Sequence, residues 1–356
     1  MEIGIAGLPG AGKTTLFNAL GHQHAHTGGY SGVEPNLAVV KVPDERLEKL
    51  SALFQPLKHT PAEVRFVDVA GVAKGMGQES SAAVLAHLRT VDVLLQVIGA
   101  FQSERDPRSD FEEFSLELQL ADLSQIEKRL DRLEKELRLG SKGTPAERAA
   151  KQRELEVLER LRPVLEAGQP ARSVELSDEE LKTIASFGFL TLKPTLVVLS
   201  LADEQDGSAL VADLSSVTRQ IPPTGVLALP GKLEMELGEL GPEDAAEFMQ
   251  ALGVEGSQLG SVTRLSYDLA ELISFFTAGE DECRAWTIRR GTPAQEAAGE
   301  IHSDLARGFI RAEVVRWDKL LEAGSEAAAK KHGWVRQEGK TYLVQDGDVL
   351  HVLFNV

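Results

Sequence analysis

The residues with the clearest chemical meaning form the segment GLPGAGKT, Gly7 to Thr14. The segment fits the pattern G-x-x-x-x-G-K-[ST] and follows the apolar run EIGIA, the context in which this pattern forms a phosphate-binding P-loop. Its glycines let backbone N–H groups turn toward phosphates, Lys13 would reach the outer phosphates, and the Thr14 hydroxyl would bind Mg²⁺. The sequence therefore predicts a magnesium-dependent nucleotide site.

An acidic residue, Asp68, ends a second apolar run and opens the segment DVAGV. Asp68 is placed to hold Mg²⁺ directly or through water, and the backbone N–H of Gly71 could meet the terminal phosphate. Val72 follows, where a Ras-type enzyme has the glutamine that orients the attacking water. A valine cannot hold a water by hydrogen bonds, so other groups must position the water of any hydrolysis.

A third segment, Ser200 to Asp203, reads SLAD and follows the apolar run TLVVL. A GTPase usually carries Asn-Lys-x-Asp here, with the aspartate paired to the guanine edge, and only Asp203 matches. The segment PGK, Pro230 to Lys232, stands where a GTPase has its second base-contacting loop. These residues leave open which base is bound.

The elements that must position these residues can be predicted from the pattern of apolar residues. Short β-branched runs alternate with amphipathic stretches over residues 1 to about 105, which predicts a parallel or mixed sheet covered by helices. Buried-strand patterns return later in the chain, so the sheet is interrupted and then continued. We expect strands at 3–7, 36–42, 63–71, 93–101, 193–203 and 224–232, and helices at 13–20 and 81–92.

In the segment that interrupts the sheet, from Phe114 to Arg162, apolar residues recur every three or four positions, which predicts helices. Thr144 and Glu147 around Pro145 predict a capping box that starts a second helix, and Ser177 with Glu180 resembles another. We therefore predict an antiparallel helical hairpin inserted into the α/β domain. The expected apolar residues are Leu116, Leu120, Leu123, Ile126, Leu130, Leu133 and Leu137 on the first helix, and Leu155, Leu158, Leu161 and Leu165 on the second.

The tail from about Phe276 predicts a small α+β module of about 80 residues, within the usual size of a domain. We expect a strand at CRAWTI, one helix over residues 293–308, and a β-hairpin at Asp346-Gly347 between two apolar runs. Basic and acidic residues nearly balance here, with basic runs at RAWTIRR and KKHGWVRQEGK. Any RNA-facing surface is expected in this part.

Composition narrows the classes of protein that fit. The chain has 356 residues, with 42% hydrophobic and 26% charged residues, as in soluble globular proteins of two or three domains. A net charge of −17 argues against a protein that coats nucleic acid with its whole surface. The single cysteine, Cys283, the lack of a basic leader before the first motif and the short apolar runs favour a cytoplasmic protein with no membrane segment.

Several segments together resemble one family over nearly the whole chain and in the same order. They are GLPGAGKTTLFNAL, VEPNLAVVKVPDERL, FVDVAGVAKG, ELQLADL, FGFLTLKPT, FFTAGEDECRAWTI, AAGEIHSDLARGFIRAE and YLVQDGDVLHVLFNV. In these segments the chain resembles the Obg-like ATPases, which are the YchF family of TRAFAC-class P-loop NTPases. The last part is the most specific and resembles the TGS domain that ends those proteins.

The resemblance implies three parts. They are a P-loop G domain with a mostly parallel sheet at residues 1–113 and 183–275, an inserted α-helical hairpin at 114–182, and an α+β, ubiquitin-like TGS domain at 276–356. It also implies a preference for ATP over GTP and binding to the ribosome or a ribosomal subunit. The nucleotide contacts that it implies are Gly10, Ala11, Gly12, Lys13, Thr14 and Thr15, with the backbone of Leu201 at the base. The motifs above add Gly71 and Asp203 as nucleotide contacts and Thr14 and Asp68 as Mg²⁺ ligands, and we expect slow hydrolysis, RNA contacts through the TGS and helical parts, and no DNA or membrane partner.

The same resemblance accounts for Val72, because the family has a hydrophobic residue in place of the catalytic glutamine. The chain departs from the family in switch I, where Gly32 replaces a metal-binding threonine and Ser31 is the nearest hydroxyl. The family's histidine after the strand at 93–101 is absent, and His87 is the candidate replacement. No catalytic side chain is therefore assigned.

Four functions stay open from the residues. The first is a slow ATPase that switches state and gains speed when a partner orders it. The second is a GTPase that uses Asp203 and the PGK loop. The third is a nucleotide-gated ribosome- or RNA-binding module that hydrolyses poorly, favoured by Gly32 and Val72. The fourth, a nucleotide kinase, would need a basic lid, which the acidic hairpin does not resemble.

Overall fold

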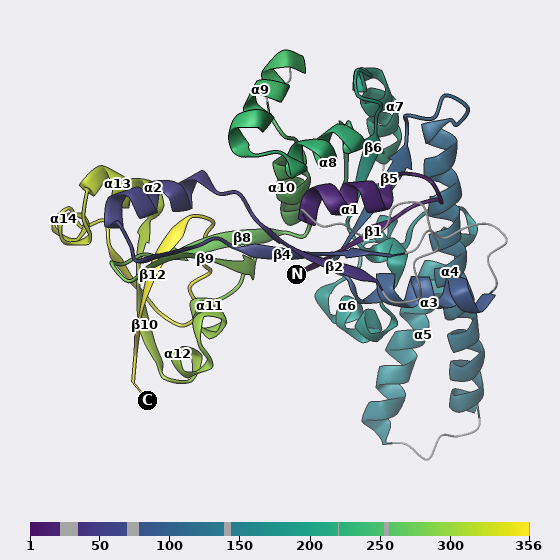
Figure 1. Ribbon diagram of the computed structural model, residues 1–356. Helices are drawn as coiled ribbons and strands as arrows, with labels where there is room; N and C mark the ends of the chain where they lie inside the picture. Colours follow the sequence, from purple (N-terminus) through teal and green to yellow (C-terminus); the bar gives the residue numbers. More distant parts are fainter. Residues whose placement is uncertain (22–34, 70–77, 139–143, 220, 253–255, 356) are drawn as a thin grey trace. The chain divides into compact units, whose positions relative to one another are not determined.

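The computed structural model describes residues 1–21, 35–69, 78–138, 144–219, 221–252 and 256–355 (Figure 1). The chain divides into two compact units, each built from two stretches of sequence. The first unit comprises Met1–Ala38 and Arg65–Leu259, and the second comprises Val39–Val64 and Gly260–Val356. The three-part boundaries at 114, 183 and 276 stay a prediction, because this division groups the helical hairpin with the first sheet.

The first unit contains a sheet whose strand order, over the described residues, is β2-β4-β1-β5-β6-β7. The pairings of β4, β1, β5, β6 and β7 are all parallel. β5 and β6 are buried along their whole length, as expected for parallel strands covered on both faces. The strands are β1 (Glu2–Ala6), β2 (Asn36–Lys41), β4 (Glu63–Asp68), β5 (Val93–Gly99), β6 (Thr195–Ser200) and β7 (Thr224–Leu229).

Helices cover this sheet. Buried side chains of α3, α4 and α7 pack on one face, while α1 packs against α8 (Figure 1). Three short 3₁₀ helices and α6 connect the hairpin to β6, with the 3₁₀ helices at η1 (Ala171–Ser173), η2 (Ala185–Phe187) and η3 (Leu190–Leu192). The helices of the first unit are α1 (Lys13–Gly21), α3 (Gln78–Thr90), α4 (Pro107–Arg138), α5 (Pro145–Glu166), α6 (Asp178–Ile184), α7 (Ser208–Thr218), α8 (Gly231–Glu239) and α9 (Pro242–Leu252), and α10 (Leu259–Leu269) leads into the second unit.

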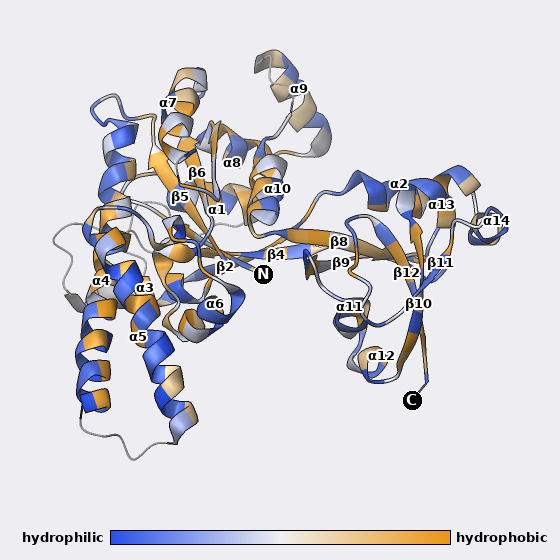
Figure 2. Ribbon diagram, turned by 180° about the vertical axis from the view of Figure 1, so that it is seen from behind, coloured by the Kyte–Doolittle hydropathy of each residue, from blue (hydrophilic) through white to orange (hydrophobic). Residues whose placement is uncertain are grey.

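The helical hairpin is formed by α4 and α5, and both predicted capping boxes are confirmed, at Thr144–Glu147 and Ser177–Glu180. The stripe predicted on the second helix is confirmed, but two residues of the first were wrong: Leu116 is 51% and Leu120 is 50% exposed. α4 begins earlier than expected and buries Phe114 and Leu118 against the sheet, so its apolar face shifts along its length (Figure 2). Its far half packs Ile126, Leu130 and Leu133 on α5.

The second unit contains another sheet, with described strands in the order β11-β10-β12-β8-β9-β3. α11 packs three buried alanines onto one face, and α2 contacts β9 and α13 (Figure 1). Its elements are α2 (Glu45–Phe54), β3 (Lys58–Thr60), β8 (Leu272–Thr277), β9 (Glu282–Arg289), α11 (Ala294–Ile301), α12 (Ser303–Arg307), β10 (Phe309–Arg316), α13 (Trp317–Ala323), α14 (Glu326–Lys331), β11 (Arg336–Glu338) and β12 (Asp348–Phe354).

Two expectations for the tail were wrong. The single helix over 293–308 is divided into α11 and α12, because His302 adopts an extended backbone and its side chain accepts from the N–H of Asp304. The hairpin at Asp346-Gly347 does not form: only the following segment, β12, is a strand, and it pairs with β10 and β8. The Asp346 carboxylate instead accepts from the N–H of Ser274, which fixes the turn against β8.

Within the described ranges, no helix is both long and apolar enough to cross a membrane.

The strand β3 belongs to the second unit although it comes early in the chain. Residues 58–60, placed by sequence between two strands of the first sheet, form β3, which pairs in parallel with β9 of the second unit. The second unit therefore includes residues from near the start of the chain.

Candidate functional site

The loop between β1 and α1 has a backbone that only glycine adopts readily. Gly7 has φ +144°, and a Cβ on it would lie 2.4 Å from the carbonyl oxygen of Val97, so no side chain fits. Gly10 and Gly12 also have positive φ, at +77° and +94°. The strand, turn and helix predicted around GLPGAGKT are thus in place, with the loop opening α1 at Lys13.

Lys13 is buried at the base of this loop, with 8% of its surface exposed. Its ammonium donates a hydrogen bond of 3.0 Å to the carbonyl oxygen of Leu8. Burial lowers the pKa of Lys13 to about 8, although the nearby carboxylate of Asp68 acts in the opposite direction. The charge of the buried ammonium is balanced only in part by Asp68, so a bound anion would stabilise its protonated form.

Asp68 ends β4 beside Thr14, whose hydroxyl donates to Asp68 Oδ2 over 3.1 Å. Burial raises the pKa of Asp68, and hydrogen bonds from Thr14 and Asn36 and the charge of Lys13 oppose that shift. One hydroxyl and one carboxylate, both hard oxygen donors, suit Mg²⁺, which takes one or two protein carboxylates and completes its shell with water and phosphate. The residues present therefore fit the predicted metal.

A cavity of about 470 Å³ opens next to the loop, and its size suits a nucleoside. Leu201 and Asp203 of the predicted base loop both line it, together with Thr15 from α1. Sequence reasoning missed two of its residues, the aromatic Phe101 and Met235, because neither belongs to a motif. The full lining is Gly12, Thr15, Phe101, Ser200, Leu201, Ala202, Asp203, Lys232 and Met235.

The loop after β6 is held firmly on one side of this cavity. Gln205 accepts from the N–H of Ala202 over 3.0 Å and donates to the carbonyl oxygen of Ala100 over 3.1 Å. The N–H of Leu201 donates to the carbonyl oxygen of Leu229 over 2.9 Å. A backbone contact from Leu201 to a base must therefore use its carbonyl oxygen, which only accepts hydrogen bonds.

The structure brings together most of the predicted site. Lys13 and Thr14 begin α1, where Thr14 contacts Asp68, and their sequence neighbours Gly12 and Thr15 line the cavity. Gly71, Val72, Ser31 and Gly32 lie outside the described residues. His87 lies in α3, where its carbonyl oxygen accepts from the Thr90 hydroxyl, and its role stays a prediction.

A P-loop between β1 and α1, on a mostly parallel sheet with a base-sized cavity beside it, defines a P-loop NTPase of the G-domain type. Comparison with family models agrees: residues 2–135 match the family described as 50S ribosome-binding GTPase. Residues 272–355 match the YchF GTPase C-terminal family, described as a protein of unknown function (DUF933).

Full-length relatives identify the family. The chain is 40% identical to the ribosome-binding ATPase YchF of Bacillus subtilis over 372 residues, covering all of both chains. It is 39% identical to the protein of the same name from Haemophilus influenzae, covering all of this chain and 99% of the relative. The solved structure of the Schizosaccharomyces pombe YchF GTPase superposes with a TM-score of 0.85 at 31% identity, covering 99% of this chain and 97% of that one. The chain belongs to the YchF family.

Proposed function

We propose that this P-loop NTPase binds ATP with Mg²⁺ and hydrolyses it slowly to ADP and phosphate, and that the nucleotide state controls binding to the ribosome. The buried, weakly compensated cation at Lys13 supports the phosphate site. Phosphoryl transfer needs mainly positioning and charge neutralisation, so a site without a side-chain base can still support slow turnover.

Each predicted residue has a role in this proposal. Backbone N–H groups from Gly10 to Thr15 bind the phosphates, Lys13 neutralises the outer ones, and Gly71 would donate to the terminal one. Thr14 and Asp68 would hold Mg²⁺, which supplies charge neutralisation between the outer phosphates when it is bound. The Thr14–Asp68 hydrogen bond keeps these two oxygen ligands together before the metal arrives.

The observation that carries the choice of ATP is the hydrogen bond from the Leu201 N–H to Leu229. Only the Leu201 carbonyl remains to face a base. A carbonyl oxygen accepts a hydrogen bond from the 6-amino group of adenine, but it repels the 6-oxygen of guanine, because both oxygens are acceptors with partial negative charge. The bacterial relatives are named ATPases, whereas the yeast protein is named a GTPase. Asp203 supports the GTPase alternative, because its exposed carboxylate lines the cavity and could accept hydrogen bonds from the guanine edge.

Competition against a fluorescent nucleotide tests the base. We expect ATP to bind at least tenfold more tightly than GTP, and Asp203→Asn to change ATP affinity less than threefold. The neighbouring Glu204→Gln, also exposed, is the matched control for lost charge. Tighter binding of GTP that collapses in Asp203→Asn but not in Glu204→Gln would establish the GTPase instead. Hydrolysis equal to that of Lys13→Ala with binding retained would establish the hydrolysis-poor module.

The ribosomal partner rests on the names of the bacterial relatives and on a surface of the second unit that combines basic and aromatic side chains. Trp334 stacks on His332 with ring centroids 4.6 Å apart, and the Lys319 ammonium lies 4.8 Å from the Trp334 ring. Aromatic faces beside cations bind unpaired RNA bases. We define this surface by Lys319, Lys331, His332, Trp334 and Arg336, and propose that it contacts ribosomal RNA in the cytoplasm.

Cosedimentation with purified ribosomal subunits tests this contact. Trp334→Ala combined with Lys331→Ala should weaken binding about tenfold or more and flatten its salt dependence. Glu300→Ala, at an exposed position of α11, is a control that adds net positive charge without removing an aromatic. Unchanged binding of the double variant, with normal nucleotide affinity, would move the proposed contact to the helical hairpin.

A further inference from the structure

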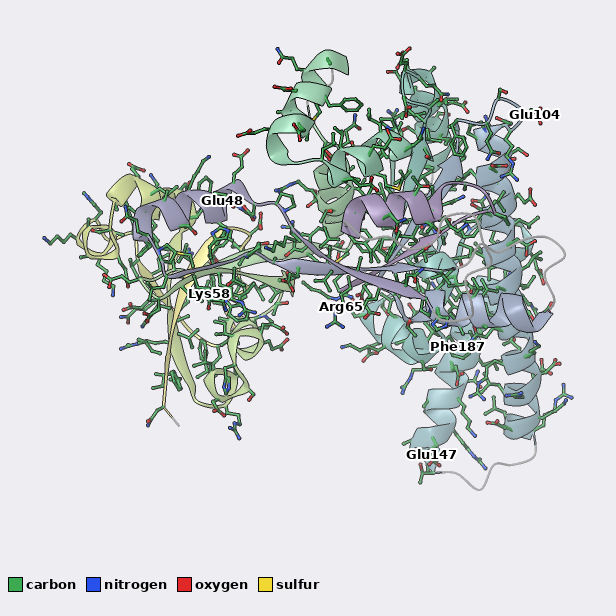
Figure 3. The ribbon with its side chains drawn as sticks, viewed as in Figure 1. Glu48, Lys58, Arg65, Glu104, Glu147 and Phe187 are labelled. Carbon is green, nitrogen blue, oxygen red and sulfur yellow. The ribbon has the colours of Figure 1, made fainter. Side chains whose placement is uncertain are left out.

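The connection between β5 and α4 lies against the P-loop. The side-chain amide of Gln102 donates to the carbonyl oxygen of Gly10 over 3.0 Å, and the guanidinium of Arg105 donates to that of Pro9 over 3.3 Å. Figure 3 labels Glu104, which precedes Arg105 in this connection. No motif predicts either contact, because both join residues more than ninety positions apart.

The position of Pro9 in the loop tells which end of a nucleotide Arg105 would meet. The cavity proposed for the base is lined by Gly12, the last glycine of the loop, and by Thr15 in the first turn of α1. The Lys13 ammonium, which reaches outer phosphates in P-loops, contacts Leu8, the residue next to Pro9. A nucleotide that runs from the cavity past Lys13 would therefore have its terminal phosphate nearest Pro9 and Arg105.

Arg105 is held loosely in this place. Its second contact, to the Asp110 carboxylate in the first turn of α4, is 3.5 Å long, and 37% of its side chain is exposed. Both contacts are longer than the usual distance of charge-assisted hydrogen bonds, about 2.7–2.9 Å. A guanidinium held this weakly can exchange one or both contacts for a phosphate, a ligand that it binds in bidentate fashion.

We propose that Arg105 is an arginine finger supplied by the chain itself, which contacts the terminal phosphate of bound ATP and stabilises the transition state of hydrolysis. The proposal rests on the ATPase function proposed above. A water oxygen attacks the γ-phosphorus while the bond from that phosphorus to the β,γ-bridging oxygen breaks, giving ADP and inorganic phosphate, and the proton of the water passes to phosphate or solvent. Arg105 would neutralise charge on the transferred group, as cis arginines do in other G domains.

The Asp110 carboxylate competes with the terminal phosphate for the guanidinium of Arg105. Asp110 belongs to α4, which continues without interruption into the helical hairpin. A partner that shifts α4 would change how much of the time the guanidinium spends on Asp110 and how much on phosphate. Asp110 is thus a positioning residue, and its removal should release Arg105 toward the nucleotide.

Single-turnover hydrolysis and equilibrium binding test the proposal together. We expect Arg105→Ala to slow hydrolysis at saturating ATP by about 30-fold or more, below the 10³–10⁵ of a fully desolvated arginine finger. ADP affinity should stay within about threefold, while affinity for a non-hydrolysable triphosphate falls. Arg105→Lys should recover part of the rate, and guanidinium ion should partly rescue Arg105→Ala but not the parent.

Arg108→Ala is the matched control, because Arg108 lies one turn away and its ion pairs with Glu112 and Asp213 join exposed side chains. It should leave rate and affinity unchanged, and Asp110→Asn should raise the rate without changing ADP affinity. Equal loss of ADP and triphosphate affinity in Arg105→Ala, or a parental rate, would overturn the proposal.

The two hypotheses can fail separately. A parent no faster than Lys13→Ala refutes the ATPase function. In that event the preference for triphosphate over diphosphate still reports on Arg105, and its persistence in Arg105→Ala refutes the contact to the terminal phosphate.

Discussion

Two clusters of charged groups, one in each unit, differ in how far their charges are compensated. In the first, Lys13 and Asp68 are buried with little compensation, and burial shifts both pKa values toward the neutral forms. In the second, Arg46 pairs with Asp44 and Asp346 at 2.7 Å each, and burial is outweighed, so the pKa of Arg46 is raised and that of Asp346 is lowered. The charges of Lys13 and Asp68 would be compensated by a bound ligand, whereas the ion pairs of Arg46 stabilise the fold of the second unit.

Replacing Lys13 should give the largest effect. Lys13→Met should weaken nucleotide binding by about 100-fold, near 3 kcal/mol, because it removes a charge-assisted contact to phosphate. The free protein should melt at the same temperature or higher, since the depressed pKa means that the folded state disfavours the charge. Calorimetry with and without nucleotide measures both, and exposed Lys128→Met on α4 is the control. A large loss of stability in the free protein would show that Lys13 is structural.

The reverse outcome is expected for Asp346. Asp346→Ala should cost about 2 kcal/mol of unfolding free energy, because it leaves the N–H of Ser274 unpaired and Arg46 short of one partner. Nucleotide affinity should not change. Because the folded pKa of Asp346 is lowered, its contribution is present above its ordinary pKa and is lost as pH falls through the folded value. Denaturation at several acidic pH values checks this, with exposed Asp318→Ala for comparison.

The pH dependence of binding sharpens the contrast further. Lys13 of the free protein loses its proton above a pKa of about 8, while bound phosphate favours the protonated form. Nucleotide affinity should therefore be flat below pH 8 and fall about tenfold per pH unit above it. Titration calorimetry from pH 7 to 9.5 should also detect proton uptake on binding in the upper range. A flat profile would mean that Lys13 keeps its charge without ligand.

The smallest effect is expected at the free end of the hairpin, near Glu147 in Figure 3. Thr144→Ala removes the hydroxyl that caps α5 and should cost about 1 kcal/mol of local stability. Hydrogen exchange in the first turn of α5 should rise, while nucleotide affinity stays constant. Thr183→Ala, whose hydroxyl bonds within α6, is the control. Altered affinity would show that the hairpin end and the site are coupled.

Residue type and short-range spacing were enough to predict those parts of the molecule that neighbouring residues determine. The glycines around Lys13, the caps at Thr144 and Ser177 and the strand ending in Asp68 follow from residue type and spacing. Leu116 and Leu120 were misplaced because α4 packs first on the sheet and then on α5, and no single period describes both. Phe101 and Met235 enter the cavity through tertiary packing, which sequence spacing does not encode.

The Asp346-Gly347 turn was misjudged for a related reason. Its sequence favours a hairpin, but the Asp346 carboxylate is satisfied by Ser274 and Arg46, both distant in sequence. The same limit applies to β3, whose pairing partner lies at the other end of the chain. Arg105 was overlooked because its contacts to Pro9 and Asp110 follow no motif.

The pairing of β3 with β9 also sets an order in time. Thr60 bonds to Glu282, 222 residues later, so β3 must wait for that stretch to be synthesised before its sheet can form. At about 5–20 residues per second this delay is roughly 10 to 45 s. By the time β9 is made, the whole of the first unit, which ends at Leu259, has left synthesis ahead of it. The segment between β2 and β4 is thus one of the first parts of the chain to be made and one of the last to find its strand partner.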